Sequence, residues 1–144
     1  MEKGGWVYIL TNKYNNVLCT GVTANLRNRV HEHKTKHDIT SFTAKYNVDK
    51  LVYFEFLDTI VEAIEMEKKI KGGSRAKKIQ LIETMNSQWL ELFQKIWKYD
   101  KIASILSTKF SQGRTEYKKI VNKSLLFSLP FQYEFQLSNI NRHH

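Results

Sequence analysis

The sequence predicts a small α/β domain in which helices flank a three-stranded sheet, in the order β-β-α-β-α-α. Two β-rich runs at 6–10 and 16–21 are separated by turn-forming residues, and a third run lies at 50–56. Amphipathic stretches with helix-capping residues follow the second and third runs. We therefore expect one α/β unit that ends near residue 97.

The first two runs are expected to form a hairpin, because the residues between them are rich in asparagine and threonine. Either Thr23 or Asn25 is expected to cap a helix over 24–36. Leu26 and Val30 share one face of this helix at a spacing of four. The second strand is thus predicted to lead directly into a basic, histidine-rich helix.

A second helix is expected directly after the third strand. Thr59 and Glu62 have the spacing of a capping box, in which each side chain satisfies a backbone N–H of the first turn. The periodic pattern continues as far as Gly72 and Gly73, which are expected to end the helix. Together these signals delimit a helix over 60–71.

Ser74 is expected to cap a third helix over 75–85, and a further amphipathic stretch lies at 89–97. These elements complete a predicted domain at 1–97. Residues 98–144 then form a basic C-terminal extension whose structure the pattern does not define.

The charge balance of the chain favours polyanionic partners. There are 23 lysines and arginines against 14 acidic residues, a net charge of +9. Such a surplus is typical of proteins that bind nucleic acid, although solubility alone also accounts for a positive charge. The extension at 98–144 is the more basic part, with 8 basic and 3 acidic residues. It is interpreted as a nucleic-acid-binding arm, a packing appendage or a poorly ordered segment, without a ranking among these.

Cys19 is the one cysteine of the chain, which excludes an internal disulfide and a zinc site built from several thiolates. A single cysteine suits a reducing compartment, so a cytoplasmic protein is expected. The apolar run near the N-terminus is too short for a signal peptide or a membrane span. No membrane association is therefore predicted, and the oligomeric state is not specified.

Glu67 is an anomaly in the apolar pattern of the second helix. Ile60, Ala63 and Ile70 form one stripe at spacings of three and four, and Glu67 falls on the same stripe. A buried carboxylate needs a cation, a hydrogen-bond network or a metal ion nearby, because burying it unpaired is costly. The simpler interpretation is that Glu67 lies at the edge of the stripe and pairs with Lys71, four residues later.

Arg29 and His33 lie four residues apart and face the same way on the first helix. A fixed guanidinium can stabilise charge on a phosphate, and an imidazole can move protons near neutral pH. The alternative is a solvated basic face made of Arg27, Arg29, His31, His33 and Lys34. A metal site built from His31, His33 and His37 is disfavoured. His31 and His33 are two residues apart, and side chains at that spacing on a helix point about 200° apart, so they would not converge on one ion.

The segment between the second and third helices is strongly basic and contains two glycines. Backbone N–H groups at the start of the following helix would suit a phosphate, although an ordinary basic connection gives the same pattern. The six basic residues of this segment are Lys68, Lys69, Lys71, Arg75, Lys77 and Lys78. The aromatic residues that could stack on bases, or belong to the core instead, are Trp6, Tyr8, Tyr46, Tyr53 and Phe54.

Taken together, these features resemble the GIY-YIG nuclease superfamily, in particular its small single-domain bacterial members. WVY at 6–8 stands at the GIY position, and CTG at 19–21 stands at the YIG position. The gap of eleven residues from Tyr8 to Cys19 is typical of the family. The resemblance spans residues 5 to about 93. Further matching segments are the Leu26-x-x-Arg29 motif and the blocks at 42–55 and 67–89.

The resemblance implies a metal-dependent phosphodiesterase that cuts DNA by attack of water on phosphorus. Glu67 would hold the metal, Mg²⁺ or Mn²⁺, and Arg29 would stabilise the pentacovalent phosphate. Tyr8 would orient or deprotonate the water, with His33 close to the nucleophile. One carboxylate, several waters and the scissile phosphate suit Mg²⁺, which sheds its own water reluctantly.

The same resemblance assigns supporting roles near the site and a nucleic-acid surface. Asn86 resembles an asparagine that braces the site, while Cys19 and Gly21 belong to the YIG position. The residues expected to contact DNA, with branched or damaged DNA among the substrates, are Arg27, Lys34, Lys71, Arg75, Lys77 and Lys78.

Cys19 is the departure from the family pattern that bears on activity, since it replaces the second signature tyrosine. A thiol is shorter than a phenol, is a weaker hydrogen-bond donor and has an ordinary pKa of about 8.5 rather than about 10. The replacements at Trp6, Val7 and Thr20 are mild. The leading prediction is a GIY-YIG-type endonuclease. The alternatives are a catalytically impaired nucleic-acid-binding module that keeps the fold, and a stable scaffold whose basic extension recruits a partner.

Overall fold

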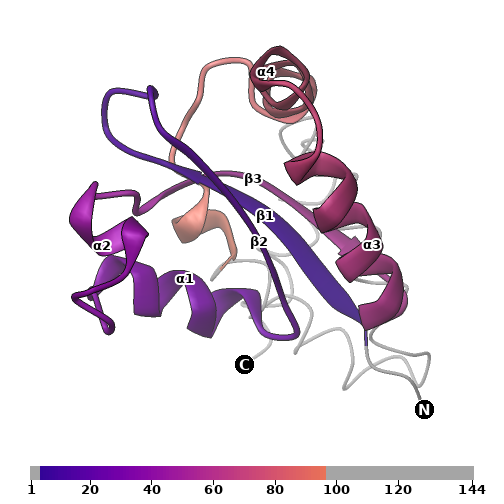
Figure 1. Cartoon of the computed structure of the whole chain (residues 1–144), viewed down its shortest axis with the longest axis horizontal. Helices are drawn as coiled ribbons and strands as arrows, with labels where there is room; N and C mark the ends of the chain where they lie inside the picture. The colour runs from indigo at the N-terminus through magenta and orange to yellow at the C-terminus, as the bar shows by residue number, and fades with distance from the viewer. Residues whose placement is uncertain (1–3, 97–144) are drawn as a thin grey trace, which may run out of the picture.

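A computed structural model describes residues 4–96 of the 144-residue chain (Figure 1). The strands are β1 (Gly5–Thr11), β2 (Leu18–Thr23) and β3 (Lys50–Leu57). The helices are α1 (Leu26–Lys34), α2 (Phe42–Lys45), α3 (Ile60–Lys71) and α4 (Arg75–Met85). The predicted α/β class is confirmed. The predicted domain end at 97 and the extension at 98–144 lie outside the described residues.

The three strands form one antiparallel sheet in the order β2-β1-β3, so β2 is an edge strand. Figure 1 shows α1 and α2 on one side of this sheet, and α3 with α4 on the other. Trp6, Tyr8 and Leu10 of β1 pack towards α1. Ile9 packs on the opposite face, with Ile82 of α4. The sheet is therefore buried on both faces, which explains the nearly continuous apolar run of β1.

Local capping signals fix where most helices begin. Asn25 caps α1 by accepting a hydrogen bond from the backbone N–H of Asn28. The capping box of Thr59 and Glu62 is present at the start of α3. Ser74 caps α4 as expected. The predictions for these three starts are confirmed, with Asn25 rather than Thr23 as the cap of α1.

The structure corrects several predicted boundaries. Strand β2 begins at Leu18 rather than at residue 16, because Asn16 is held in the turn by two hydrogen bonds with the side chain of Asn12. Helix α1 ends at Lys34, and the next residue but one, Lys36, has a φ of 52° that no α-helix accommodates. The short helix α2 was not predicted.

The amphipathic stretch at 89–97 is not a continuous helix in its described part. Trp89 has a φ of 54°, and helical structure begins only at Phe93. Leu92 donates its backbone N–H to the carbonyl of Leu51 in β3, at 2.9 Å. The buried residues of this stretch, Leu92, Phe93 and Ile96, pack on the same face of the sheet as α1. No helix among residues 4–96 has the length and apolar character needed to cross a membrane.

Asn86 ties the end of α4 to the sheet. Its buried side-chain amide donates to the carbonyls of Val52 and Leu90, at 3.2 and 2.8 Å. Its side-chain oxygen accepts from the backbone N–H of Leu90 at 2.9 Å. One amide thus satisfies three backbone groups that helix and sheet leave open.

Replacing Asn86 with Ala is expected to lower the free energy of unfolding by about 2 kcal/mol or more, because the buried backbone partners lose their hydrogen bonds. Urea unfolding followed by circular dichroism measures this change. The matched control is Gln80→Ala on the exposed face of α4, which should change stability little. Equal stability of the two variants would contradict the bracing role.

Candidate active site

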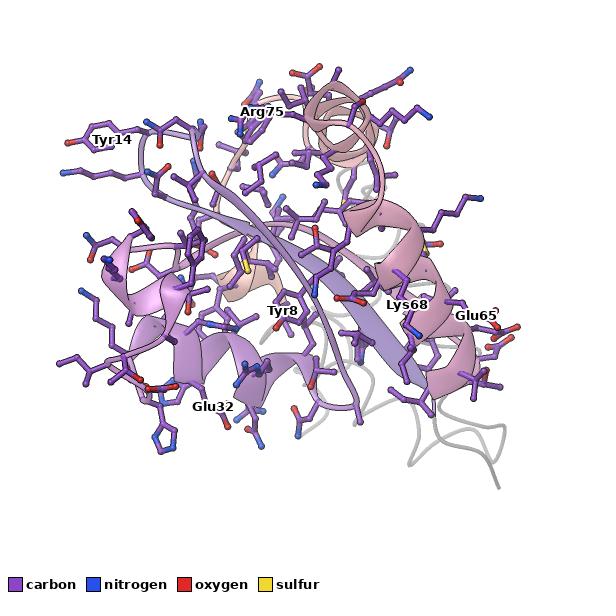
Figure 2. All side chains as sticks on the ribbon, viewed as in Figure 1. Tyr8, Tyr14, Glu32, Glu65, Lys68 and Arg75 are labelled. Atoms are coloured by element: carbon purple, nitrogen blue, oxygen red, sulfur yellow. The ribbon has the colours of Figure 1, made fainter. Side chains whose placement is uncertain are left out.

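A cleft of about 420 Å³ lies along β2, and α1, α2 and α3 contribute to its walls. Four of its lining residues are those predicted to be catalytic. Figure 2 shows Tyr8 near the middle of the sheet, between α1 and α3, whereas Glu65 points away from the sheet on the outer side of α3. The residues of the cleft that matter for its chemistry are Tyr8, Cys19, Gly21, Arg29, His33, Ser41, Thr43, Glu67 and Lys71.

Tyr8 reaches this cleft because its neighbour on β2 is a glycine. Tyr8 lies directly opposite Gly21 in the register of β1 and β2. A Cβ atom added to Gly21 would lie 2.4 Å from both Cζ and the hydroxyl oxygen of Tyr8. The tyrosine ring therefore occupies the space that any larger residue at 21 would fill. Only glycine at this position lets the Tyr8 ring pass over the edge strand.

The hydroxyl of Tyr8 meets the imidazole of His33 on α1, with 3.2 Å between the oxygen and Nε2. The other ring nitrogen, Nδ1, lies 2.9 Å from Oγ1 of Thr43. Burial raises the pKa of Tyr8 above its usual 10. Burial and then the charge of Arg29 lower the pKa of His33 below 6.5. At neutral pH the pair is therefore a protonated phenol beside a neutral imidazole.

Arg29 adds a fixed positive charge to the same wall of the cleft. Its Nη1 donates to Oε2 of Glu32, one turn along α1, at 2.8 Å. The guanidinium also lies close enough to the hydroxyl of Tyr8 to act to lower the pKa of that phenol, against the larger effect of burial. Because the side chain is about half exposed, at 48%, the guanidinium remains open to an anion in the cleft. The spacing of four between Arg29 and His33 places both groups at one phenol.

Glu67 lies on the opposite side of the cleft, on α3. It is buried, with 7% of its surface exposed, and it forms an ion pair with Lys71. Both predictions for this residue therefore hold in part, since Glu67 is on the buried stripe and also pairs with Lys71. The lysine side chain is 58% exposed. The Glu67 carboxylate is thus more buried than the Lys71 ammonium that pairs with it, and a ligand cation could displace the exposed lysine.

The chemistry of Glu67 fits Mg²⁺ or Mn²⁺. These ions bind readily through one carboxylate while keeping most of their water. Residues 4–96 contain no group of three or more histidines, cysteines or carboxylates that could enclose a metal ion. Glu67 is the buried carboxylate of this cleft and is the residue that would hold such an ion.

Cys19 lies on β2 at the wall of this cleft, two residues before Gly21. Burial raises the pKa of its thiol, and the opposing effects of Lys71 and Arg29 are smaller. The thiol is therefore protonated at neutral pH and is a poor base.

The predicted DNA-contacting residues are distributed over several surfaces, and only Lys71 lines the cleft. Lys34 donates to Oε2 of Glu91 and to the carbonyl of Asp49, at 2.9 and 2.8 Å. Arg75 donates to the carbonyl of Asn15 at 3.5 Å. Lys77 and Lys78 line a separate groove between α3 and α4, with Ile70 and Leu81 among its apolar walls. That groove has the larger volume, about 540 Å³, but contains none of the four predicted catalytic residues.

Most aromatic residues considered as base-stacking groups belong to the core. Trp6, Tyr53 and Phe54 are buried, whereas Tyr46 is 45% exposed. The Tyr46 ring packs on Phe42, with 4.7 Å between the ring centroids. Phe42 lies at the rim of the cleft.

Sequence reasoning missed the contribution of α2 and the turn before it. This segment supplies Asp38, Ser41, Phe42 and Thr43 to the cleft, and Lys36 and His37 line it as well. The one available signal was Ser41, which caps α2 by accepting from the backbone N–H of Ala44. A serine before a four-residue helix gives no periodic pattern, so the segment resembled a loop.

The chain is thus a small three-stranded α/β domain with tyrosine, arginine, histidine and glutamate around one polar cleft. The sequence matches the family described as the GIY-YIG catalytic domain over residues 4–80. This region is more than half of the chain, and the protein belongs to the GIY-YIG family, whose domains are of the nuclease type.

Relatives of the chain are named without an activity. The chain is 36% identical over 78 residues to a UPF0213 protein of Syntrophus aciditrophicus strain SB. The aligned region covers 54% of this chain and 88% of that protein. The solution NMR structure of a UPF0213 protein from Bacillus halodurans is 27% identical, with a TM-score of 0.40. That comparison covers 60% of this chain and 89% of the other.

Replacing Gly21 with Ala is expected to displace the Tyr8 ring while the domain stays folded, because the conflict is with the tip of one side chain. NMR signals of the Tyr8 and His33 rings should then shift together, as their hydrogen bond breaks. The matched control is Gly72→Ala, where the nearest atom would be at 3.4 Å, an ordinary contact. Unchanged ring signals in the Gly21 variant would contradict this account of the cleft.

Proposed function

We propose that the protein is a metal-dependent DNA endonuclease that hydrolyses phosphodiester bonds. One observation supports this most strongly. Tyr8 from β1, Arg29 and His33 from α1, and Glu67 from α3 all line a single cleft. The GIY-YIG family membership and the net charge of +9 point to the same polyanionic substrate.

In this proposal the scissile phosphate lies between the two walls of the cleft. Arg29 donates to a non-bridging oxygen and stabilises the charge that builds up on phosphorus. Tyr8 binds the attacking water and removes its proton, with His33 next to it as the neutral base. Glu67 on the opposite wall holds the ion. That ion, when bound, supplies Lewis-acid stabilisation of the phosphate.

The DNA backbone would extend from this cleft over neighbouring basic residues. Lys71 and Lys36 line the cleft itself, and both are exposed. Arg75, Lys77 and Lys78 surround the start of α4, where backbone N–H groups add to the attraction for phosphate. The proposed substrate is DNA in branched or damaged form, as well as in single-stranded and duplex form. The proposed location of the protein is the cytoplasm.

The proposal predicts that Tyr8→Phe, Arg29→Ala and Glu67→Gln each lower kcat by about 100-fold or more, because each removes a group that acts in the transition state. Cleavage of single-stranded, duplex and branched DNA with Mg²⁺ or Mn²⁺ measures this loss. The chain offers two matched controls on exposed positions away from the cleft, Tyr14→Phe and Glu65→Gln. Full activity of Glu67→Gln would refute the assigned site.

A second candidate, a catalytically impaired nucleic-acid-binding module, is favoured by one residue, Cys19. Its protonated thiol cannot take over proton transfer from the tyrosine that it replaces. The substitution Cys19→Tyr separates the two candidates. If the native chain binds DNA without cutting it, and Cys19→Tyr cuts, the binding module is the better description. Cleavage by the native chain selects the endonuclease.

The pH dependence of cleavage should follow His33. Because its pKa lies below 6.5, the neutral base is available above that pH and is lost as the pH falls through the lowered pKa. The raised pKa of Tyr8 keeps the phenol protonated beyond pH 10. We expect kcat/KM to rise with pH to a plateau, with the midpoint of the rise below pH 6.5. A plateau that begins only above pH 8, measured under saturating metal, would exclude His33 as the base.

A further inference from the structure

A chain of four hydrogen bonds runs through the cleft from the Tyr8 hydroxyl to the carbonyl of Asp38. The Tyr8 hydroxyl contacts Nε2 of His33 at 3.2 Å. Beyond the imidazole, Nδ1 lies 2.9 Å from Oγ1 of Thr43. The last links are Thr43 to Ser41, at 3.2 Å between the hydroxyl oxygens, and Ser41 to the Asp38 carbonyl, at 2.7 Å.

One end of this chain has a fixed polarity. A backbone carbonyl only accepts, so the Ser41 hydroxyl donates its single proton to Asp38. The Ser41 oxygen also accepts from the backbone N–H of Ala44, which holds it in place at the start of α2.

The remaining proton positions follow from this end. Since Ser41 has no second proton, the contact between the two hydroxyls is a hydrogen bond only if Thr43 donates. Thr43 has then used its own proton, so it accepts from Nδ1 of His33. A neutral imidazole carries one N–H, which leaves Nε2 as an acceptor for the Tyr8 proton. With a neutral imidazole, no other assignment places a proton in every contact.

We propose that Thr43 and Ser41 are positioning residues that hold His33 as the Nδ1–H tautomer, with the lone pair of Nε2 aimed at the Tyr8 hydroxyl. The tautomer follows from the hydrogen bonds of a neutral imidazole. Its catalytic consequence rests on the proposed function. This role extends the site to α2, an element that contributes no charged group to the imidazole.

The consequence is a directed transfer of one proton during hydrolysis. As the water oxygen bonds to phosphorus, a water proton moves to the Tyr8 oxygen, and the Tyr8 proton moves to Nε2. The bond from phosphorus to the leaving oxygen breaks, and that oxygen keeps the electron pair. His33 becomes an imidazolium that still donates Nδ1–H to Thr43. With the other tautomer, an N–H would face the phenol and Tyr8 would have no acceptor.

Neutral hydroxyls also explain why this base remains uncharged before the reaction. The charged groups that act on the imidazole are Arg29 and, more weakly, Glu32 from its own helix. Tyr8 of β1 and Thr43 of α2 meet it as neutral groups. A carboxylate at the position of Thr43 would favour the imidazolium, whereas a hydroxyl orients the ring without stabilising its charge.

The test is nitrogen NMR of the histidine side chains in the full chain, which distinguishes Nδ1–H from Nε2–H directly. His33→Gln assigns the His33 signals. We expect Nδ1–H in the native chain and in Thr43→Ser, which keeps the hydroxyl. In Thr43→Val, of similar shape but without the hydroxyl, the preference for Nδ1–H should be lost. An Nε2–H tautomer in the native chain overturns the proposal, as does an unchanged tautomer in Thr43→Val.

Kinetics provide the second readout. Thr43→Val should lower kcat by about tenfold or more with little change in KM for DNA, and Thr43→Ser should restore most of it. The matched control is Thr84→Val on the exposed face of α4, which should leave both constants unchanged. The Nδ1–H tautomer in a chain that cuts no DNA would refute the proposed function and leave this assignment intact. Native kcat in Thr43→Val would refute the positioning role alone.

Discussion

The contact between Tyr8 and Gly21 is the constraint on which the site depends. The groups that form the cleft come from opposite faces of the sheet, since α1 packs on one face and α3 on the other (Figure 1). They meet because β2 is an edge strand and lacks a side chain at the position beside Tyr8. The phenol can then extend from the central strand to the imidazole of His33. A larger residue at 21 would take the space of the Tyr8 ring and prevent the contact between Tyr8 and His33.

The two key charges of the cleft each have a partner one turn away on their own helix. Arg29 pairs with Glu32, and Glu67 pairs with Lys71. The side chains of Arg29 and Lys71 are 48% and 58% exposed, and ion pairs with such exposed members are weak in water. The two pairs neutralise the charges of Arg29 and Glu67, and they are weak enough to be replaced by a ligand. In the proposed function a phosphate would take the place of Glu32 at the guanidinium, and a metal ion would take the place of Lys71 at the carboxylate.

How much could be predicted depended on whether the signal was local. The caps at Asn25, Thr59 and Ser74, and the misplaced charge at Glu67, are visible within one turn of helix. The GIY-YIG resemblance gave the identity of the residues but no contacts between them. Sequence spacing could not show that Thr43 meets His33, or that Glu91 engages Lys34, because these pairs join segments without a shared period. The polarity of the hydrogen bonds in the cleft required coordinates.

The central claim is that residues from β2, α1 and α3 form one metal-dependent site. Paramagnetic broadening of the amide NMR signals by substoichiometric Mn²⁺ tests it most directly. The account predicts that the signals of Glu67, Cys19 and Gly21 broaden first, followed by those of Arg29 and His33, while Gln80 on the exposed face of α4 stays sharp. Glu67→Gln should abolish the effect. Broadening centred elsewhere in the chain, or persisting in that variant, would contradict it.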